Sequence, residues 1–295
     1  MENTRAKTTR NSLILLLTAT IWGMAFVSQS KGMDYMHPFT FNGVRSLIGA
    51  AGILVYILIS RKIAGDKAAK LDWKLNVKAG LLCGIFLTIA STLQQFGIKY
   101  TSVGKAGFIT TLYIIFVPMF GIFLKKKVAP VVWAAAGMAA VGMYLLCMTE
   151  SLRLGAGDIM VFLCAIAFAI QIMTVDHYAA SIDGAVVSCI QFTVCGVVCC
   201  IGALIWGQPT FGQIQEGLGA LLYAGVLSCG VGYTLQIVGQ KGLNPTVAAL
   251  IMSLESVIAT ISGWIAYKIG FLSTDQTLTP RQIAGCIIVF AAVIL

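Results

Sequence analysis

One carboxylate and one guanidinium occupy positions where the sequence is otherwise apolar. Glu255 stands near the middle of the run 244–267, and Arg45 stands about a turn and a half into the run 38–60. A charge at the centre of a bilayer costs about 2.5–3.5 kcal/mol, so each needs a cavity or an interior partner. Glu255 is therefore either a contact for a substrate or proton, or a structural partner for Arg45 or a neighbouring helix. Arg45 either reaches the interface, pairs with an acid, or caps helix carbonyls.

Buried amides form the second class of candidate. Gln94 and Gln236 occupy matching places in two similar segments, and Gln171 and Gln191 lie in other apolar runs. Amides in membranes often join helices, each worth less than about 2 kcal/mol. A matched pair that converges from two halves would instead line a binding site, and both readings stay open for Gln94 and Gln236. Three aromatic residues complete the candidates for lining a cavity: Trp22, Tyr113 and Tyr233.

Other chemistries lack the residues that they need. Nine cysteines lie within apolar runs, with no C-x-x-C pair and no accompanying histidines, which indicates packing and not a metal site. The two histidines, His37 and His177, stand at the ends of apolar runs. The sequence has no G-x-S-x-G, H-E-x-x-H or phosphate-loop motif. We therefore expect no catalytic residues, no metal, no cofactor and no enzymatic activity.

The composition is typical of a membrane protein. Hydrophobic residues make up 58% of the 295 residues and charged residues only 11%, whereas a soluble domain has about 25% charged residues. Charge-free stretches long enough to cross a bilayer recur along the whole length. The sequence therefore predicts an all-α membrane protein that crosses the bilayer many times.

Polar and Pro/Gly-containing interruptions divide the chain into ten expected transmembrane helices. They cover roughly residues 12–30, 38–60, 76–98, 103–124, 129–148, 157–177, 184–206, 214–240, 244–267 and 281–295. The tenth is short, because it extends only from Arg281 to Leu295.

An internal repeat organises these helices. Residues 91–109 and 233–251 match at a constant offset of 142, with Thr92, Leu93, Gln94, Gly97, Lys99 and Ala106 recurring as Thr234, Leu235, Gln236, Gly239, Lys241 and Ala248. An offset of 146 aligns Trp22 with Phe168 and Arg45 with Gln191. Five spans per half make the second half enter from the opposite side. We therefore predict two inverted five-helix repeats around a central cavity, over residues 12–148 and 157–295.

The distribution of lysine and arginine predicts the orientation. Basic residues gather in the N-terminal tail and in the connections after the second and fourth spans: Arg5, Lys7, Arg10, Arg61, Lys62, Lys67, Lys70, Lys74, Lys78, Lys125, Lys126 and Lys127. The opposite side has only Lys31, Lys99, Lys105 and Arg153. We expect the protein to lie in the cytoplasmic membrane, with its N-terminus in the cytoplasm. The net charge of +9 then reflects topology and not nucleic-acid binding.

Residues 12–295 resemble a known family of membrane transporters. Trp22-Gly23 in the first span, Arg45 in the second and Ser253-Leu254-Glu255 in the ninth resemble the ten-helix EamA-type permeases of the drug/metabolite transporter superfamily. The resemblance implies an inverted-repeat bundle that exchanges access to a central cavity, for small metabolites such as amino acids or related compounds. The chain departs from the family pattern at Ser256, where a proline is usual, and at Lys125–Lys127, where an acid is common.

The sequence as a whole predicts a secondary-active transporter. Its partners would be a small-molecule substrate, the lipid bilayer and a coupled proton or ion, because no nucleotide-binding motif is present. The competing class is a non-transporting membrane scaffold or receptor. The longest polar connection, residues 61–78, is too short for a receptor domain outside the bilayer.

The orientation can be tested by cysteine accessibility. A cysteine placed at Lys67 or at Lys126 should react with a membrane-impermeant reagent only from the cytoplasmic side, because both belong to the basic connections. Labelling of Lys67→Cys from outside intact cells would reverse the predicted topology.

Overall fold

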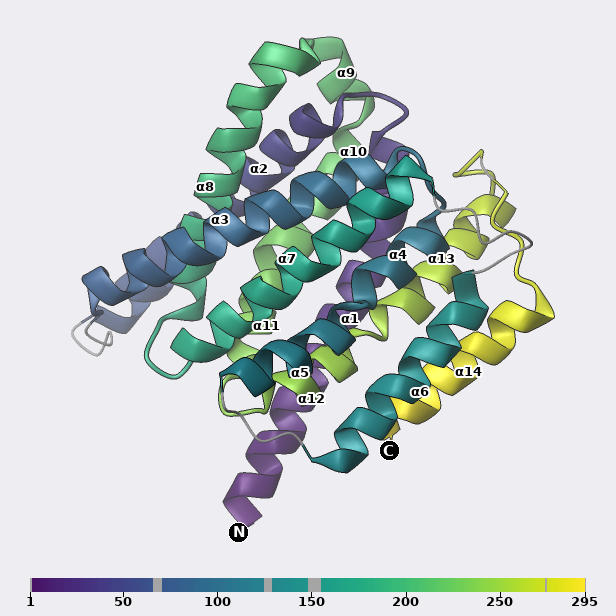
Figure 1. Ribbon diagram of the computed structural model, residues 1–295. Helices are drawn as coiled ribbons and strands as arrows, with labels where there is room; N and C mark the ends of the chain where they lie inside the picture. Colours follow the sequence, from purple (N-terminus) through teal and green to yellow (C-terminus); the bar gives the residue numbers. More distant parts are fainter. Residues whose placement is uncertain (1, 66–70, 125–128, 148–154, 274, 295) are drawn as a thin grey trace.

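The protein is a bundle of helices (Figure 1). The computed structural model describes residues 2–65, 71–124, 129–147, 155–273 and 275–294, and these ranges contain helices and connections but no strand. Eight helices in this part of the chain are long and apolar enough to cross a membrane, and two shorter apolar helices, Pro130–Gly142 and Pro280–Ile294, match the fifth and tenth expected spans. The predicted all-α membrane fold is confirmed.

The first half contributes five spans, of which the fourth is built from two helices. The helices are α1 (Glu2–Gly32), α2 (Pro38–Ala64), α3 (Trp73–Ile98), α4 (Val103–Thr111), α5 (Tyr113–Phe123) and α6 (Pro130–Cys147). The second half is more fragmented. It consists of α7 (Ala156–Tyr178), α8 (Gly184–Gly202), η2 (Ala203–Gly207), α9 (Phe211–Glu216), α10 (Leu218–Leu222), η3 (Tyr223–Gly232), α11 (Tyr233–Gln240), α12 (Pro245–Met252), α13 (Glu255–Lys268) and α14 (Pro280–Ile294). Segments η2 and η3 are π-helical.

Polar caps start equivalent helices in both halves. The Ser102 side chain accepts a hydrogen bond from the Lys105 amide at the start of α4. At the matching position of the repeat, Asn244 accepts one from the Thr246 amide at the start of α12. Such caps satisfy amides that have no partner inside the helix. Because lipid supplies no partner for these groups, a capping residue indicates where a span can begin.

The fourth and ninth spans are interrupted, whereas the sequence predicted continuous helices over 103–124 and 244–267. The Leu112 amide donates to the Ile109 carbonyl, and the Leu254 amide donates to the Ile251 carbonyl, so both helices tighten by one residue at these points. Leu112 and Leu254 are related by the same offset as the sequence repeat. Neither position is a proline or glycine, which is why local sequence did not predict the interruptions. As a result, Tyr113 and Glu255 are the first residues of α5 and α13.

The two halves pack through spans that hold the same place in each half, the second with the seventh, the fourth with the ninth and the fifth with the tenth (Figure 1). α2 contacts α8, α4 contacts α13, α5 contacts α12, and α6 contacts α14. The remaining contacts are reciprocal, because α3 packs on α7 and α11 packs on α1. Self-paired and reciprocal contacts of this kind are typical of two units related by a two-fold axis. They agree with the predicted inverted repeat, whose boundaries at 12–148 and 157–295 stay a prediction.

One close helix crossing occurs twice. A Cβ atom at Gly97 of α3 would lie 2.8 Å from the Gly157 carbonyl oxygen and would also overlap the Val161 side chain of α7. The corresponding Gly239 of α11 meets Leu15 of α1, with 2.7 Å between a built Cβ and Leu15 Cδ2. Small residues let helix backbones approach in a membrane, where packing replaces the hydrophobic effect as the driving force. The repeated glycine is therefore explained by helix contact.

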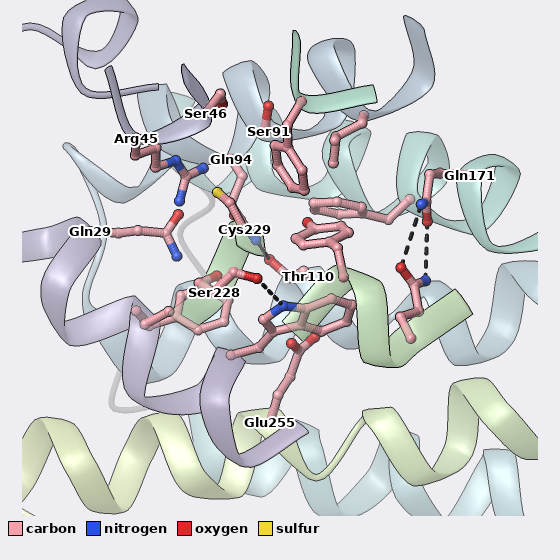
Figure 2. A pocket seen from close by; sticks show the side chains of 18 of the residues that line it. Gln29, Arg45, Ser46, Ser91, Gln94, Thr110, Gln171, Ser228, Cys229 and Glu255 are labelled. Atoms are coloured by element: carbon pink, nitrogen blue, oxygen red, sulfur yellow. Dashed lines mark hydrogen bonds between the residues drawn. The ribbon is translucent and has the colours of Figure 1, made fainter. Parts of the chain in front are cut away.

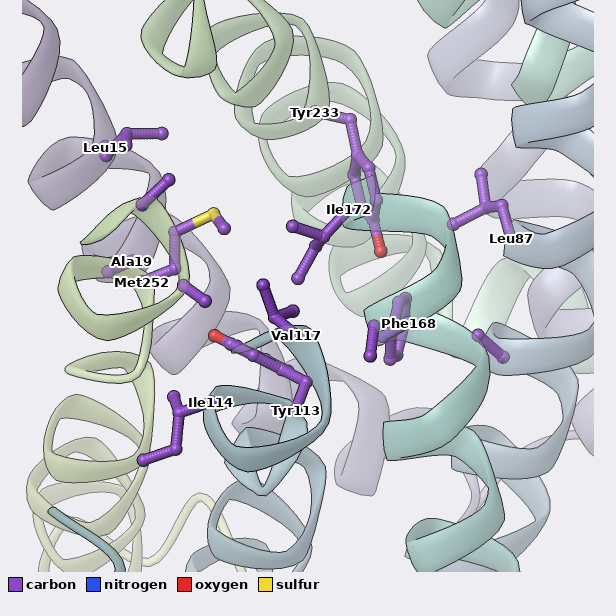
Figure 3. Packing of buried hydrophobic residues seen from close by; sticks show 14 of the residues in the cluster. Leu15, Ala19, Leu87, Tyr113, Ile114, Val117, Phe168, Ile172, Tyr233 and Met252 are labelled. Atoms are coloured by element: carbon purple, nitrogen blue, oxygen red, sulfur yellow. The ribbon is translucent and has the colours of Figure 1, made fainter. Parts of the chain in front are cut away.

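The buried apolar core joins both halves (Figure 3). Its largest cluster includes Leu15 and Ala19 of α1, Ile114 and Val117 of α5, Phe168 and Ile172 of α7, and Met252 of α12. The basic residues Lys67, Lys70 and Lys125–Lys127, on which the orientation prediction depends, lie outside the described residues.

We expect Gly97→Ala to destabilise the bundle, because the added methyl group meets a backbone carbonyl of α7. Overpacking of this kind costs about 1–3 kcal/mol. Gly52→Ala in α2 is the matched control, since a Cβ atom there has no neighbour within 4 Å, and it should be neutral or stabilising by up to about 1 kcal/mol. Thermal unfolding in detergent measures both, and equal stability of the two variants would contradict the assigned contact.

Candidate functional site

A pocket lies at the centre of the bundle, where helices of both halves meet (Figure 2). Its cavity volume is about 30 Å³, room for about one or two water molecules, so the pocket is nearly closed in this conformation. Eight of the nine residues predicted for the site line it: Trp22, Arg45, Gln94, Tyr113, Gln171, Tyr233, Gln236 and Glu255. The exception is Gln191, which is fully buried behind Gln171 and accepts a 3.5 Å hydrogen bond from its Nε2. Gln191 does not line the pocket in this conformation, and its role in substrate binding stays a prediction.

Glu255 is held by a residue at the equivalent position of the other half. The Tyr113 hydroxyl donates to Glu255 Oε1 at 3.0 Å, and the two residues are 142 positions apart. Repeat-related residues can touch only near the axis that relates the halves, so this hydrogen bond marks the centre of the bundle. Glu255 is also in the first turn of α13, where the helix dipole favours a negative charge.

The first span approaches Glu255 through Gly23. A Cβ atom at Gly23 would lie 2.7 Å from the Glu255 carbonyl oxygen and 2.6 Å from Ile258 Cβ. The absence of a side chain therefore lets α1 contact α13 beside the carboxylate. This contact gives the Trp22-Gly23 pair of the sequence a structural reason.

Three aromatic rings of the pocket lining pack against one another. The rings of Trp22 and Tyr233 have centroids 4.5 Å apart, and Phe192 meets Tyr233 edge-on at 5.0 Å. Trp22 Nε1 donates to the Ser228 carbonyl at 3.4 Å, in the π-helical segment η3. This hydrogen bond to the backbone fixes the indole ring against the other half of the molecule.

Arg45 enters the pocket from a different side than Glu255 (Figure 2). Both are buried, with 5% and 3% of their surface exposed. The described residues contain two ion pairs, Lys31–Asp34 and Lys105–Asp158, and neither includes Arg45 or Glu255. The interpretation of Glu255 as an ion-pair partner of Arg45 is therefore wrong in this conformation.

The matched glutamines both reach the pocket but have different partners. Gln94 donates to the Thr110 hydroxyl at 3.2 Å. Gln236 donates to Gln171 Oε1 at 3.2 Å and accepts from Gln171 Nε2 at 3.5 Å. Both glutamines therefore line the same pocket. Each also joins two helices, Gln94 linking α3 to α4 and Gln236 linking α11 to α7.

Several lining residues were not singled out from the sequence, namely Gln29, Ser46, Ser91, Thr110, Phe168, Ser228 and Cys229. Phe168 had a signal, because the offset of 146 pairs it with Trp22. The small hydroxyl and thiol residues had none, since serine, threonine and cysteine are common in packed membrane helices.

An inverted pair of helical units around a buried polar pocket is the architecture of secondary transporters. The chain belongs to the EamA-like transporter family, whose model matches residues 10–148 and, separately, 155–295. The family resemblance of the sequence is thereby confirmed. Membership indicates a multi-pass membrane transporter and not an enzyme, and it implies a lipid bilayer and a small-molecule substrate as partners.

Curated relatives agree with this class. The chain is 27% identical over 287 residues to an "Uncharacterized transporter" of Archaeoglobus fulgidus, covering 95% of this chain and 83% of that protein. It is 27% identical over 257 residues to "Uncharacterized transporter YwfM" of Bacillus subtilis, covering 85% and 84%. A solved structure described as "Crystal structure of protein" superposes with a TM-score of 0.73 at 16% identity, over 97% of this chain and 95% of its own, which shows a shared fold.

A double-mutant cycle tests the central hydrogen bond. Tyr113→Phe and Glu255→Gln should be non-additive by about 1–3 kcal/mol in unfolding free energy, because each removes part of one interaction. Tyr223→Phe is the matched control, since the Tyr223 hydroxyl donates to the Ile21 carbonyl and not to Glu255. It should add to Glu255→Gln without coupling, and a Tyr113 pair that is equally additive would refute the contact.

Proposed function

We propose that the protein is a secondary-active transporter that moves a small metabolite by alternating access. The observation that carries the proposal is one buried pocket, built by both halves, that holds a carboxylate and a guanidinium without pairing them. Inverted-repeat transporters bind substrate at the interface of their repeats. A bundle that served only as an anchor would gain nothing from two buried charged side chains that do not pair with each other, which favours transport over a scaffold or receptor.

The substrate would lie among the polar and aromatic groups of the pocket. We assign contacts to Glu255 and Arg45, to the amides of Gln94, Gln171 and Gln236, and to the rings of Trp22, Tyr113 and Tyr233. An amino acid or a related compound fits this assignment, because it presents an ammonium group to Glu255 and hydrogen-bonding groups to the amides. The interrupted helices beside Tyr113 and Glu255 are places where a change of access could bend the spans.

Glu255 is the group that we assign to coupling. When the substrate is absent, a proton would neutralise the carboxylate and lower the cost of returning it through the apolar bundle. The energy would then come from a substrate or ion gradient, in agreement with a sequence that contains no nucleotide-binding loop. We further place the protein in the cell membrane with its N-terminus in the cytoplasm, on the basis of the basic residues.

Reconstituted vesicles test the proposal. Wild-type protein should exchange at least one member of a metabolite panel, measured as counterflow of labelled compound, at a rate that changes with pH. Glu255→Gln keeps the shape of the side chain and should fold, but lose most transport or its pH dependence. Glu216→Gln is the control, since Glu216 is exposed at the end of α9. An unchanged rate and pH profile in Glu255→Gln would reduce Glu255 to a structural residue.

A further inference from the structure

The Arg45 head group is buried, and no carboxylate among the described residues forms an ion pair with it. Its Nε atom has no hydrogen-bond partner in this part of the chain. The Phe41 ring lies 5.4 Å from the guanidinium carbon, and Cys229 and Tyr233 line the same pocket. A buried charge is costly unless it is paired and hydrogen-bonded, so this head group is suited to a negatively charged ligand in the pocket.

The pocket offers a second unsatisfied group and two hydroxyls. Gln29 lies beside Arg45 in Figure 2, is 4% exposed, and has an Oε1 atom without a hydrogen-bond partner among the described residues. Ser46 donates to the Cys195 sulfur at 3.4 Å. The Ser91 hydroxyl lies 3.4 Å from the same sulfur and also donates to the Thr88 carbonyl at 3.5 Å. A thiol is a weak acceptor, so the Ser46 hydroxyl gains by turning to a charged oxygen, and the long Ser91 hydrogen bond can be exchanged for a charge-assisted one. Gln29, Arg45, Ser46 and Ser91 all line the central pocket.

We propose that Arg45, Ser46, Ser91 and Gln29 form a subsite for an organic carboxylate that carries a hydroxyl or ammonium group on the adjacent carbon. The planar guanidinium binds both carboxylate oxygens, and the serine hydroxyls donate to the same oxygens. Gln29 Oε1 accepts the hydrogen bond of the neighbouring O–H or N–H group. This assignment rests on the proposed transport function, because it names the chemistry of the molecule that occupies the same pocket.

The second half of the molecule does not repeat this subsite. At the offset of 146, Arg45 and Ser46 correspond to Gln191 and Phe192, and at the offset of 142, Ser91 corresponds to Tyr233. The charge is therefore replaced by an amide, and both serines are replaced by residues with aromatic rings. This difference between the halves makes the pocket asymmetric, so a ligand would bind with its carboxylate toward α2.

Binding to the full-length protein in detergent tests the subsite. Lactate, alanine and their amides, lactamide and alaninamide, are titrated at constant ionic strength, and apparent affinities are taken from the shift in thermal unfolding. Each carboxylate should bind at least about tenfold more tightly than its amide, since a charge-assisted hydrogen bond is worth at least one factor of ten. Comparing lactate with alanine distinguishes the hydroxyl from the ammonium group.

Substitutions assign the effect to Arg45. Arg45→Gln introduces the side chain of the equivalent position in the other half, and it should weaken carboxylate binding by at least about tenfold while leaving the amides unchanged. Arg45→Lys, which keeps the charge, should retain part of the preference. Arg281→Gln is the control, because Arg281 is exposed and lies over Tyr144, away from the pocket.

Three results would overturn the subsite: no stabilisation of the wild type by either carboxylate, equal affinity for carboxylates and amides, or an equal loss of both in Arg45→Gln. Vesicle transport separates this inference from the function. Transport by a wild type without carboxylate preference overturns the subsite alone. Carboxylate binding without transport of any panel compound supports the subsite and overturns the transporter.

Discussion

The hydrogen bond between Tyr113 and Glu255 is the interaction on which the centre of the molecule depends. A carboxylate in an apolar bundle must be solvated by the protein itself, because lipid offers no donor. The bond requires α5 and α13 to begin at the same level, which the two helix interruptions before Tyr113 and Glu255 achieve. It also requires α1 to pass close to α13, which Gly23 permits. The pocket is the space that remains around these contacts.

The repeat explains the architecture, but the chemistry of the two halves differs. At one end of the bundle, the start of α4 is tied to the start of α7 by the Lys105–Asp158 ion pair, with Nζ and Oδ2 2.6 Å apart. At the other end, α1 is tied to the connection before α12 by a neutral hydrogen bond of 2.8 Å from Asn11 to the Lys241 carbonyl. The two ends are related in geometry and unequal in charge. The two halves therefore share a fold, but they differ in the charge of the side chains that join their helices.

Charged residues in apolar spans predicted the lining of the pocket better than the alignment of the two repeats did. Glu255 and Arg45 were recognised because a charge in an apolar span has few explanations, and both line the pocket. Gln191 does not line the pocket, because its offset match to Arg45 fixes only a position along the helix, and its amide is buried against Gln171. Gln29 gave no signal, because a single amide near the end of a span is as often a helix contact as a ligand contact.

The amino-acid sequence by itself determined the membrane class, the spans, the duplication and the residues whose burial needs a reason. These follow from local properties, since each spanning helix must form its own backbone hydrogen bonds and present apolar side chains to the lipid over the thickness of the bilayer. Only the tertiary structure decided that Glu255 meets Tyr113 and not Arg45, that Gln236 pairs with Gln171, and that the fourth and ninth spans break. These outcomes depend on the rotation and depth of each helix, which are set by close crossings such as Gly97 on α7, between residues far apart in the chain.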